Sequence, residues 1–224
     1  MKILAIIPAR GGSKGIPKKN IVLARGKPLI AWTIESALSA GIDRVFVSSD
    51  SDEILEIAKK YGAETIKRPS NLSGGKICSD VAIWHALAHL EKTEKFFPDM
   101  AILLQPTSPL RESKDIKNAL KLFTKEKSAT SLISVFETDN KYLKSFLLDK
   151  KRYMHGICND TFPFMDRQLL PKLYMPNGAI YIVRKKVFKK KSLFTDKTIP
   201  YVMTKEKSLD IDVWEDIAIV EKSL

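Results

Sequence analysis

IIPARGGSKGIPKKN, residues 6–20, joins an apolar run at the start of the chain to a basic, glycine-rich loop. Gly11, Gly12 and Gly15 let the backbone turn tightly and approach a ligand, so that peptide N–H groups converge on anionic oxygens. Positive charge surrounds the same point and is supplied by Arg10, Lys14, Lys18 and Lys19. The stretch therefore predicts a phosphate-binding loop that follows a buried strand.

The spacing of this loop separates it from two common phosphate binders. A Walker loop needs Gly, four residues and then Gly-Lys-Ser/Thr, and a dinucleotide fold needs Gly-x-Gly-x-x-Gly; neither pattern is present. A solvated basic turn would explain the lysines. It would not explain three glycines and an arginine directly behind an apolar strand, so we favour a phosphate loop of another kind.

Composition indicates an ordinary folded protein. A chain of 224 residues with 44% hydrophobic content can bury one sizeable core, so we predict a single domain over residues 1–224. No secretory leader is evident, and no apolar run approaches the ~20 residues that span a bilayer, so we expect a cytoplasmic protein without a membrane partner. Cys78 and Cys158 lie in no paired pattern, which argues against a disulfide framework or a zinc site.

The charge balance favours anionic ligands. Lys and Arg number 38 against 26 Asp and Glu, a formal net charge of +12. Much of the excess lies in the clusters 184–186 and 189–191, which we interpret as a solvated face. Because no helix-turn-helix, zinc finger or aromatic RNA-reading motif accompanies them, we expect no nucleic-acid partner.

Strand and helix patterns alternate along the first half of the chain. This order is typical of parallel strands joined by right-handed crossovers, and it predicts a three-layer, Rossmann-like α/β fold with ligands at the carboxyl ends of the strands. The expected strands are 2–8, 44–49, a short one around Thr65, and 100–104. The expected helices are 28–40, 52–61, 79–90 and 115–123.

The alternation breaks from about Thr138 to Met175, where polar, aromatic and proline-containing segments replace it. We interpret residues 138–175 as a small excursion that forms a dimerisation and substrate-contact lobe. The chain then returns to the core with a strand over 178–183, a last strand that ends near Leu209, and a helix over 214–224.

Asp210 and Asp212 are candidate metal ligands. They flank Ile211 in a segment expected to be extended, so both carboxylates should project to the same side. Mg²⁺ is usually bound through one or two carboxylates together with substrate phosphates, which would suit a nucleoside triphosphate held by the glycine-rich loop. The structural alternative is that one of these acids caps the following helix.

Several further polar loops are informative only when they are considered together. In their order and spacing they resemble the cytidylyltransferases that activate nonulosonic acids, above all CMP-N-acylneuraminate (CMP-sialic acid) synthetases, from Ile6 to about Ile217. Such enzymes have the nucleotidyltransferase type of α/β fold. The segments that carry the resemblance are 9–15 with Lys19-Asn20, 47–50, Arg68-Pro69, 104–111, 176–181 and 208–212.

The resemblance implies that CTP and a nine-carbon 2-keto sugar acid react to give a CMP-sugar and pyrophosphate, with Mg²⁺ as cofactor. Asp212, helped by Asp210, would hold the metal. The residues implied in nucleotide binding are Ala9, Arg10, Gly12, Ser13, Lys14, Asn20, Arg68 and Ser79, with Arg10, Lys14, Lys19 and Asp212 as the catalytic set. The residues implied in sugar binding are Gln105, Lys144, Arg167 and Tyr181.

Members of this family are homodimers whose excursion reaches the neighbouring active site, so the resemblance also implies a homodimer. Segment 156–171 looks most like bacterial sialic acid synthetases, which favours N-acetylneuraminic acid as the substrate. Legionaminic and pseudaminic acids are alternatives, and 3-deoxy-octulosonic acid is a more distant one. A hypothesis from another class is a nucleotide-sensing or RNA-binding protein without catalysis, which would have no need of the Asp210 and Asp212 pair.

Overall fold

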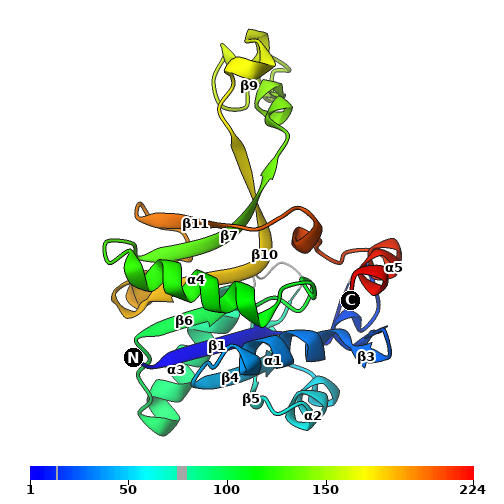
Figure 1. Ribbon diagram of the computed structural model, residues 1–224, viewed down its shortest axis with the longest axis vertical. Helices are drawn as coiled ribbons and strands as arrows, with labels where there is room; N and C mark the ends of the chain where they lie inside the picture. The colour runs from blue at the N-terminus through cyan, green and yellow to red at the C-terminus, as the bar shows by residue number, and fades with distance from the viewer. Residues whose placement is uncertain (14, 75–79) are drawn as a thin grey trace.

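A seven-stranded sheet forms the centre of the computed structural model, which describes residues 1–13, 15–74 and 80–224. Its strands lie in the order β11-β7-β10-β6-β1-β4-β5 (Figure 1). All neighbouring strands are parallel except β10, which runs antiparallel to both β6 and β7. The strands are β1 (Ile3–Pro8), β4 (Arg44–Ser49), β5 (Glu64–Lys67), β6 (Met100–Leu103), β7 (Ser131–Thr138), β10 (Leu173–Arg184) and β11 (Thr198–Val202).

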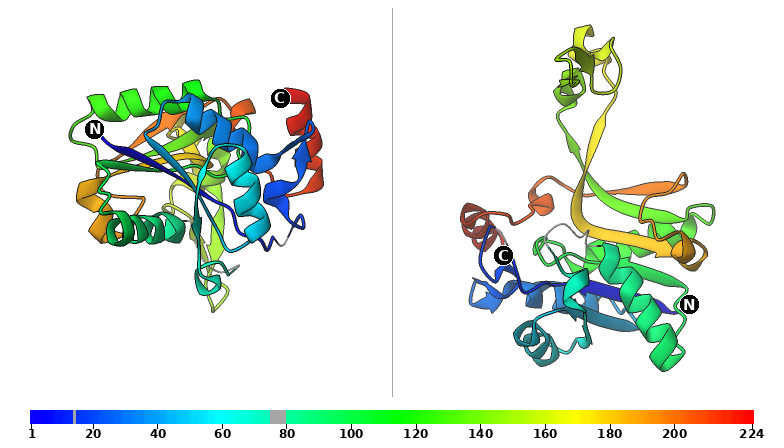
Figure 2. Two further views of the ribbon diagram at one scale, coloured as in Figure 1. Left: turned by 90° about the horizontal axis from the view of Figure 1, so that it is seen from below. Right: turned by 180° about the vertical axis from the view of Figure 1, so that it is seen from behind.

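Helices cover both faces of this sheet (Figure 2). Successive side chains of β1 point to opposite faces, so Ala5 and Ile7 join one buried cluster while Leu4 and Ile6 join another. The first cluster includes α1, α2 and α4, and the second includes α3. The helices are α1 (Leu29–Ser39), α2 (Asp52–Lys60), α3 (Asp80–Glu94), α4 (Ser113–Lys125) and α5 (Trp214–Ser223). The three-layer, Rossmann-like, mainly parallel fold predicted from the sequence is thus confirmed.

A small satellite cluster joins the two ends of the chain. The hairpin of β2 (Leu23–Ala24) and β3 (Lys27–Pro28) packs with α5, and Ile217 and Val220 of that helix are buried there. Within the part of the chain that the structure describes, no helix is long and apolar enough to cross a membrane.

Two strands in the second half of the chain differ from the prediction. β7 was not expected, and the last strand, β11, ends at Val202 rather than near Leu209; residues Glu206–Ser208 form a 3-10 turn instead. β11 contains Pro200, which cannot donate a ladder hydrogen bond. It is tolerated because β11 lies at the edge of the sheet and pairs only with β7.

An arm, defined as residues 138–175, projects from the sheet (Figure 1). Antiparallel pairing of β7 with β10 continues as far as Thr138 and Leu173 and forms its base. The remainder consists of the two-stranded sheet of β8 (Phe146–Leu148) and β9 (Met154–Gly156) with the 3-10 turns Asn140–Lys144, Phe162–Phe164 and Arg167–Leu169. Within the arm only Leu143 and Leu170 are buried.

Candidate active site

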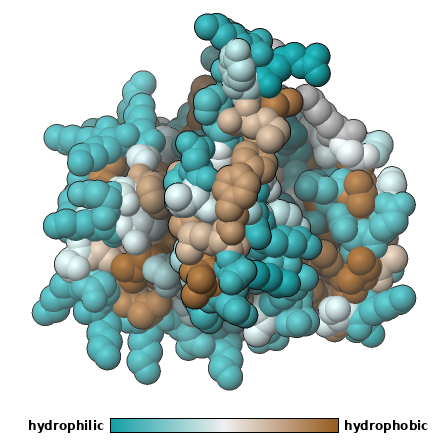
Figure 3. Space-filling view, turned by 90° about the horizontal axis from the view of Figure 1, so that it is seen from above, coloured by the Kyte–Doolittle hydropathy of each residue, from teal (hydrophilic) through white to brown (hydrophobic). Residues whose placement is uncertain are grey.

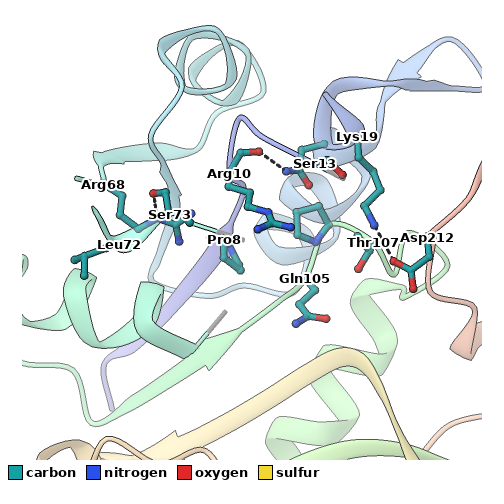
Figure 4. Close-up of a pocket in the computed structure, with 13 residues that line it drawn as sticks. Pro8, Arg10, Ser13, Lys19, Arg68, Leu72, Ser73, Gln105, Thr107 and Asp212 are labelled. Atoms are coloured by element: carbon teal, nitrogen blue, oxygen red, sulfur yellow. Dashed lines mark hydrogen bonds and ion pairs between the residues drawn. The ribbon is translucent and has the colours of Figure 1, made fainter. Parts of the chain in front are cut away.

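A polar pocket of about 250 Å³ opens at the carboxyl end of β1. Ligand sites of open α/β sheets lie at this edge because the loops that follow neighbouring strands meet there. Figure 4 shows Arg68 and Ser73 on one side of the pocket, Lys19 and Asp212 on the other, and Arg10 between them. The lining residues are Pro8, Arg10, Ser13, Lys19, Asn20, Arg68, Leu72, Ser73, Gly74, Gln105, Pro106, Thr107 and Asp212.

Buried polar groups fix the glycine-rich loop where it leaves β1. The N–H of Ala9 donates to the carbonyl of Ser48 at 3.0 Å, and the N–H of Gly11 donates to the Asp50 carboxylate at 2.8 Å. Asn20, only 7% exposed, donates from its side-chain amide to the carbonyl of Arg10 at 2.9 Å. The loop is therefore held at both ends, which keeps the Arg10 guanidinium in the pocket.

The same loop is joined to the carboxylate segment near the other end of the chain. The Lys19 ammonium donates to the Ile211 carbonyl at 2.5 Å and to the Asp212 carboxylate at 3.0 Å. A Cβ at Gly15 would lie 2.5 Å from the Asp212 carbonyl oxygen, so only glycine fits there. The phosphate loop and the candidate metal ligand therefore form one surface, with the cation and the carboxylate already paired.

The carboxylate pair does not lie on a strand, which corrects the sequence-based expectation. The N–H of Ile211 donates to the Thr107 carbonyl at 2.9 Å, outside any strand ladder, and the Ile211 side chain is fully buried. Asp210 and Asp212 flank it and are exposed, so the expected alternation holds in an extended loop. The Asp216 carboxylate accepts hydrogen bonds from the N–H groups of Asp212 and Val213 at the start of α5. Asp216 therefore caps this helix, which is the role that the structural alternative assigned to Asp210 or Asp212.

The local charge around Asp210 fits a divalent cation. Partial burial of the carboxyl group raises the pKa of Asp210, and the nearby Asp212 carboxylate raises it further. A hydrogen bond from the Thr107 hydroxyl and the charge of the Lys19 ammonium lower it in part. The Asp212 carboxylate is thus close enough to Asp210 to add negative charge at the same point. Among the described residues no third carboxylate, His or Cys joins the pair. The donor set therefore suits Mg²⁺, which takes one or two carboxylates and completes its shell with phosphate and water.

Arg68 forms the opposite side of the pocket. It follows β5, is 5% exposed, and is held by its backbone N–H on the Ser49 carbonyl at 2.7 Å and by its Nε on the Ser73 hydroxyl at 3.0 Å. Burial lowers the pKa of Arg68, as does the nearby charge of Arg10, while Asp50 raises it. A guanidinium fixed in this way is a rigid donor for carbonyl or phosphate oxygens.

Gln105 lies in the turn that follows β6, and this turn is clamped against β10. The Nη1 of Arg111 donates to the carbonyls of Gln105 and Ala179 at 3.2 and 3.0 Å. Arg111 is 1% exposed, and burial lowers the pKa of its guanidinium to about 9. Gly178 has φ +74°, and a Cβ there would lie 2.5 Å from the Gln105 amide oxygen.

Other predicted site residues lie elsewhere. Tyr181 is half-buried on β10, outside the pocket lining, although the charge of Asp210 contributes to its raised pKa. Lys144 and Arg167 are in the arm, where Lys144 donates to the Met165 carbonyl at 3.0 Å and Arg167 pairs with Asp139 at 3.1 Å. Within one chain the arm does not bring them to the pocket (Figure 1).

Four more predicted residues belong to the loops. Ala9 is buried and contributes only its backbone, while Gly12 is exposed with open space beside its Cα. Lys14 and Ser79 lie outside the described residues.

Some residues of the site escaped sequence reasoning. Thr107, Leu72 and Ser73 line the pocket, and the sequence marked their segments only as polar loops. Asp50 was not among the predicted site residues, and its carboxylate accepts the N–H of Gly11 at the pocket edge. Its position directly after a strand, beside the phosphate loop, is the signal that could have identified it.

A glycine-rich loop and a cationic pocket at the carboxyl edge of a mainly parallel sheet are typical of nucleotide-binding α/β proteins. Residues 4–218 match the cytidylyltransferase family model, so the chain belongs to the cytidylyltransferase family. The resemblance seen in the sequence is thereby confirmed.

Two curated relatives support this membership. It is 36% identical over 220 residues to the N-acylneuraminate cytidylyltransferase of Streptococcus agalactiae serotype III, a match that covers 96% of this chain and 52% of that protein. It is 35% identical over 220 residues to the pseudaminic acid cytidylyltransferase of Campylobacter jejuni, covering 97% and 94%. The chain thus spans about half the length of the first relative and nearly all of the second.

The fold also matches a solved CMP:2-keto-3-deoxy-manno-octonic acid synthetase complexed with CTP. The TM-score is 0.72 at 18% sequence identity, and the match covers 100% of both chains. At this identity the match supports the fold.

Proposed function

We propose that the protein transfers CMP from CTP to the anomeric hydroxyl of N-acetylneuraminic acid and releases pyrophosphate. One observation carries the proposal: Lys19 joins the phosphate loop to Asp212 within the pocket that also contains Arg68 and Gln105. Family membership and the two relatives, which act on N-acylneuraminate and pseudaminic acid by name, support the same reaction.

The triphosphate would lie along the glycine-rich loop. Arg10, Ser13 and Lys19 line the pocket and would neutralise the phosphates, and Lys14 belongs to the same loop. Nucleotidyl transfer depends mainly on positioning and on stabilising charge, because no covalent bond to the protein is needed. This requirement matches a pocket that is rich in fixed cations and whose described lining contains no Cys or His.

The cytosine base and the sugar acid would contact the other two sides of the pocket. Arg68, held rigidly by Ser73, would donate to the cytosine, and Ser79 would assist it; Asn20 would orient the nucleotide through the loop that it clamps. Gln105 would hold the sugar acid near the α-phosphate.

In the transfer step the anomeric oxygen of the sugar attacks the α-phosphorus in line with the leaving group. A bond forms between that oxygen and phosphorus while the bond to the bridging oxygen of pyrophosphate breaks, and the hydroxyl proton passes to solvent. Asp210 and Asp212 would hold Mg²⁺, which when bound supplies positive charge to the phosphate oxygens. Arg10 and Lys19 would stabilise the charge that develops on the departing pyrophosphate.

We further propose a homodimer in which the arm of a second copy completes the sugar site. The arm exposes large apolar side chains, including Phe164 at 82%, Leu148 at 65% and Met154 at 61%, and apolar groups of this density are typical of an interface. Figure 3 looks down on this side of the molecule and shows a stripe of hydrophobic side chains across it. Lys144 and Arg167 lie in the arm, so this arrangement would bring both to a neighbouring pocket.

Pyrophosphate release is the test of the reaction. The purified chain is incubated with Mg²⁺, each of the four nucleoside triphosphates, and N-acetylneuraminic, legionaminic, pseudaminic or 3-deoxy-octulosonic acid. We expect rapid release only with CTP and fastest release with N-acetylneuraminic acid. Preference for another acid would retain the mechanism and replace the substrate. CTP binding without release with any acid would overturn the proposal in favour of a non-catalytic nucleotide-binding protein.

A further inference from the structure

A second cavity, of about 440 Å³, lies at the edge of the sheet opposite the active-site pocket. It opens between α3, the loop before β6 and the 3-10 segment Lys185–Lys190 that follows β10. Because β10 is antiparallel to β6, its last residue, Arg184, pairs with Met100 at the start of β6. The cavity therefore lies at the amino ends of the parallel strands, where the proposed reaction has no use for it.

The walls of this cavity are aromatic and aliphatic. Trp84 and Leu87 of α3 face it together with Phe97 and Phe188, and the Trp84 and Phe188 rings pack with their centroids 6.5 Å apart. Phe97 is 44% exposed, so apolar surface remains open to solvent. The indole N–H of Trp84 is buried behind this wall and finds no acceptor among the described residues.

The rim of the cavity is positively charged. Lys185, Lys189 and Lys191 line it, against a single carboxylate from Glu91. Within the described chain none of these three lysines forms an ion pair with a carboxylate. The ammonium of Lys185 instead lies 5.5 Å from the centre of the Phe97 ring, at the boundary between the apolar walls and the charged rim.

Three lysines of the basic clusters thus lie at the rim of an apolar cavity, and their side chains remain exposed to solvent. Preformed clefts of ~300–1,000 Å³ with apolar walls and a few polar groups are typical of small-molecule sites. An apolar body would gain by entering between the aromatic rings, and a negative group beside it would meet the unpaired lysines.

We propose that the cavity between α3 and Lys185–Lys190 binds a small amphiphilic anion. The apolar part of the ligand lies against Trp84 and Phe188, and its carboxylate or phosphate group faces the lysines of the rim. The proposal does not depend on the proposed reaction, because the residues of the two sites do not overlap.

Calorimetric titration of the full chain with decanoate tests the proposal. The matched cation, decyltrimethylammonium, has the same apolar chain and the opposite charge. We expect saturable binding of decanoate and at least tenfold weaker binding of the cation. Absence of decanoate binding, or equal binding of both amphiphiles, would overturn the proposal.

Two variants locate the binding. Ala88 is an exposed residue of α3 that lines the cavity, so Ala88→Trp fills the space without disturbing the core and should weaken decanoate binding at least tenfold. Ala218→Trp, on the exposed face of α5, is the matched control and should bind as the unaltered chain does. Equal binding by both variants would place the ligand elsewhere and refute the assignment.

Charge reversal tests how much the lysines of the rim contribute to binding, apart from the apolar walls. The double variant Lys185→Glu and Lys189→Glu should weaken decanoate binding about tenfold and bring the two amphiphiles close to equal affinity. The control reverses Lys121 and Lys125, exposed residues of α4, and should change neither affinity. Unaltered circular dichroism and an unaltered melting temperature show that each variant is folded. Displacement of decanoate by single-stranded RNA but not by phosphate would instead indicate a nucleic-acid surface and overturn the proposal.

Discussion

The active-site pocket and the arm are held in place by different means. In the pocket, buried polar side chains set the geometry: Asn20, Arg68 and Arg111 are 7%, 5% and 1% exposed, and each is hydrogen-bonded to a neighbouring loop. The arm has only Leu143 and Leu170 buried and exposes large apolar side chains. The pocket is thus positioned by the core of its own chain, whereas the arm leaves apolar surface for another surface to cover.

A buried polar network joins these two regions. The Asn177 amide oxygen accepts from the Ser134 hydroxyl of β7 at 2.6 Å, and its amide nitrogen donates to the Ser208 hydroxyl at 2.9 Å. The Ser108 hydroxyl, beside the Gln105 turn, donates to the Asn177 carbonyl at 3.1 Å. The base of the arm, the Gln105 turn and the segment that leads to Asp210 therefore meet at one residue.

The largest effect is expected from Asp212→Asn in the pocket. The substitution keeps the size of the side chain but removes a charge needed to hold the metal, so turnover should fall by roughly a thousandfold. Asp212 is exposed, and the melting temperature should hardly change. The measurement is pyrophosphate release, with the exposed Asp196→Asn as the matched control. Full activity in the Asp212 variant would remove the metal from the mechanism.

Asn177→Ala should produce the next largest effect, on stability. It removes the acceptor of the buried Ser134 hydroxyl and of the Ala179 N–H, and the donor to the Ser208 hydroxyl, so the free energy of unfolding should fall by about 2–4 kcal/mol. Urea unfolding gives the value. The matched control is Asn140→Ala in the arm, whose amide bonds to two backbone carbonyls near the surface and whose loss should cost under ~1 kcal/mol. Equal losses would contradict the contrast between the two regions.

Arg167→Lys should change substrate use by a smaller factor. If the arm of a second copy supplies the carboxylate contact, lysine cannot reproduce the bidentate fork, and the KM for the sugar acid should rise about tenfold. The KM for CTP should stay within about twofold. Steady-state kinetics with each substrate varied gives both constants. Equal changes in the two would indicate that Arg167 acts only through its ion pair with Asp139.

The smallest effect on folding is expected from Phe164→Ser at the arm. Phe164 is 82% exposed, so the free energy of unfolding of the single chain should change by less than ~0.5 kcal/mol. If the arm forms a dimer interface, the dissociation constant should nevertheless rise at least tenfold. Sedimentation equilibrium measures this change. An unaltered chain that stays monomeric at all concentrations would refute the interface.

Much of the fold could be predicted because its signals are local. Strand Arg44–Ser49 was predicted to the residue, and the cores of α1 and α2 follow from apolar spacing. β7 was missed because it depends on pairing with β10 and β11. β11 was misplaced because it pairs with β7 and carries a proline that its edge position tolerates.

The candidate site was predictable to a similar degree. Arg10, Lys19, Arg68, Gln105 and Asp212 were selected from their motifs and line one pocket. Lys144 and Arg167 were selected in the same way, and one chain does not bring them there. Their role in sugar binding stays a prediction, because it depends on a second copy and not on the packing of this chain.

The sequence by itself determined the alternation of strands and helices in the first half of the chain, the glycine-rich loop and the carboxylate pair, because glycine content, apolar period and residue spacing act over short stretches of chain. Only the tertiary structure decided that Gly15 and Lys19 close on Asp212, that Arg111 is buried between the Gln105 turn and β10, and that the lysines after β10 surround an apolar cavity. Each of these arrangements depends on side chains from distant segments that pack against one another, and their contact is set by the assembled core.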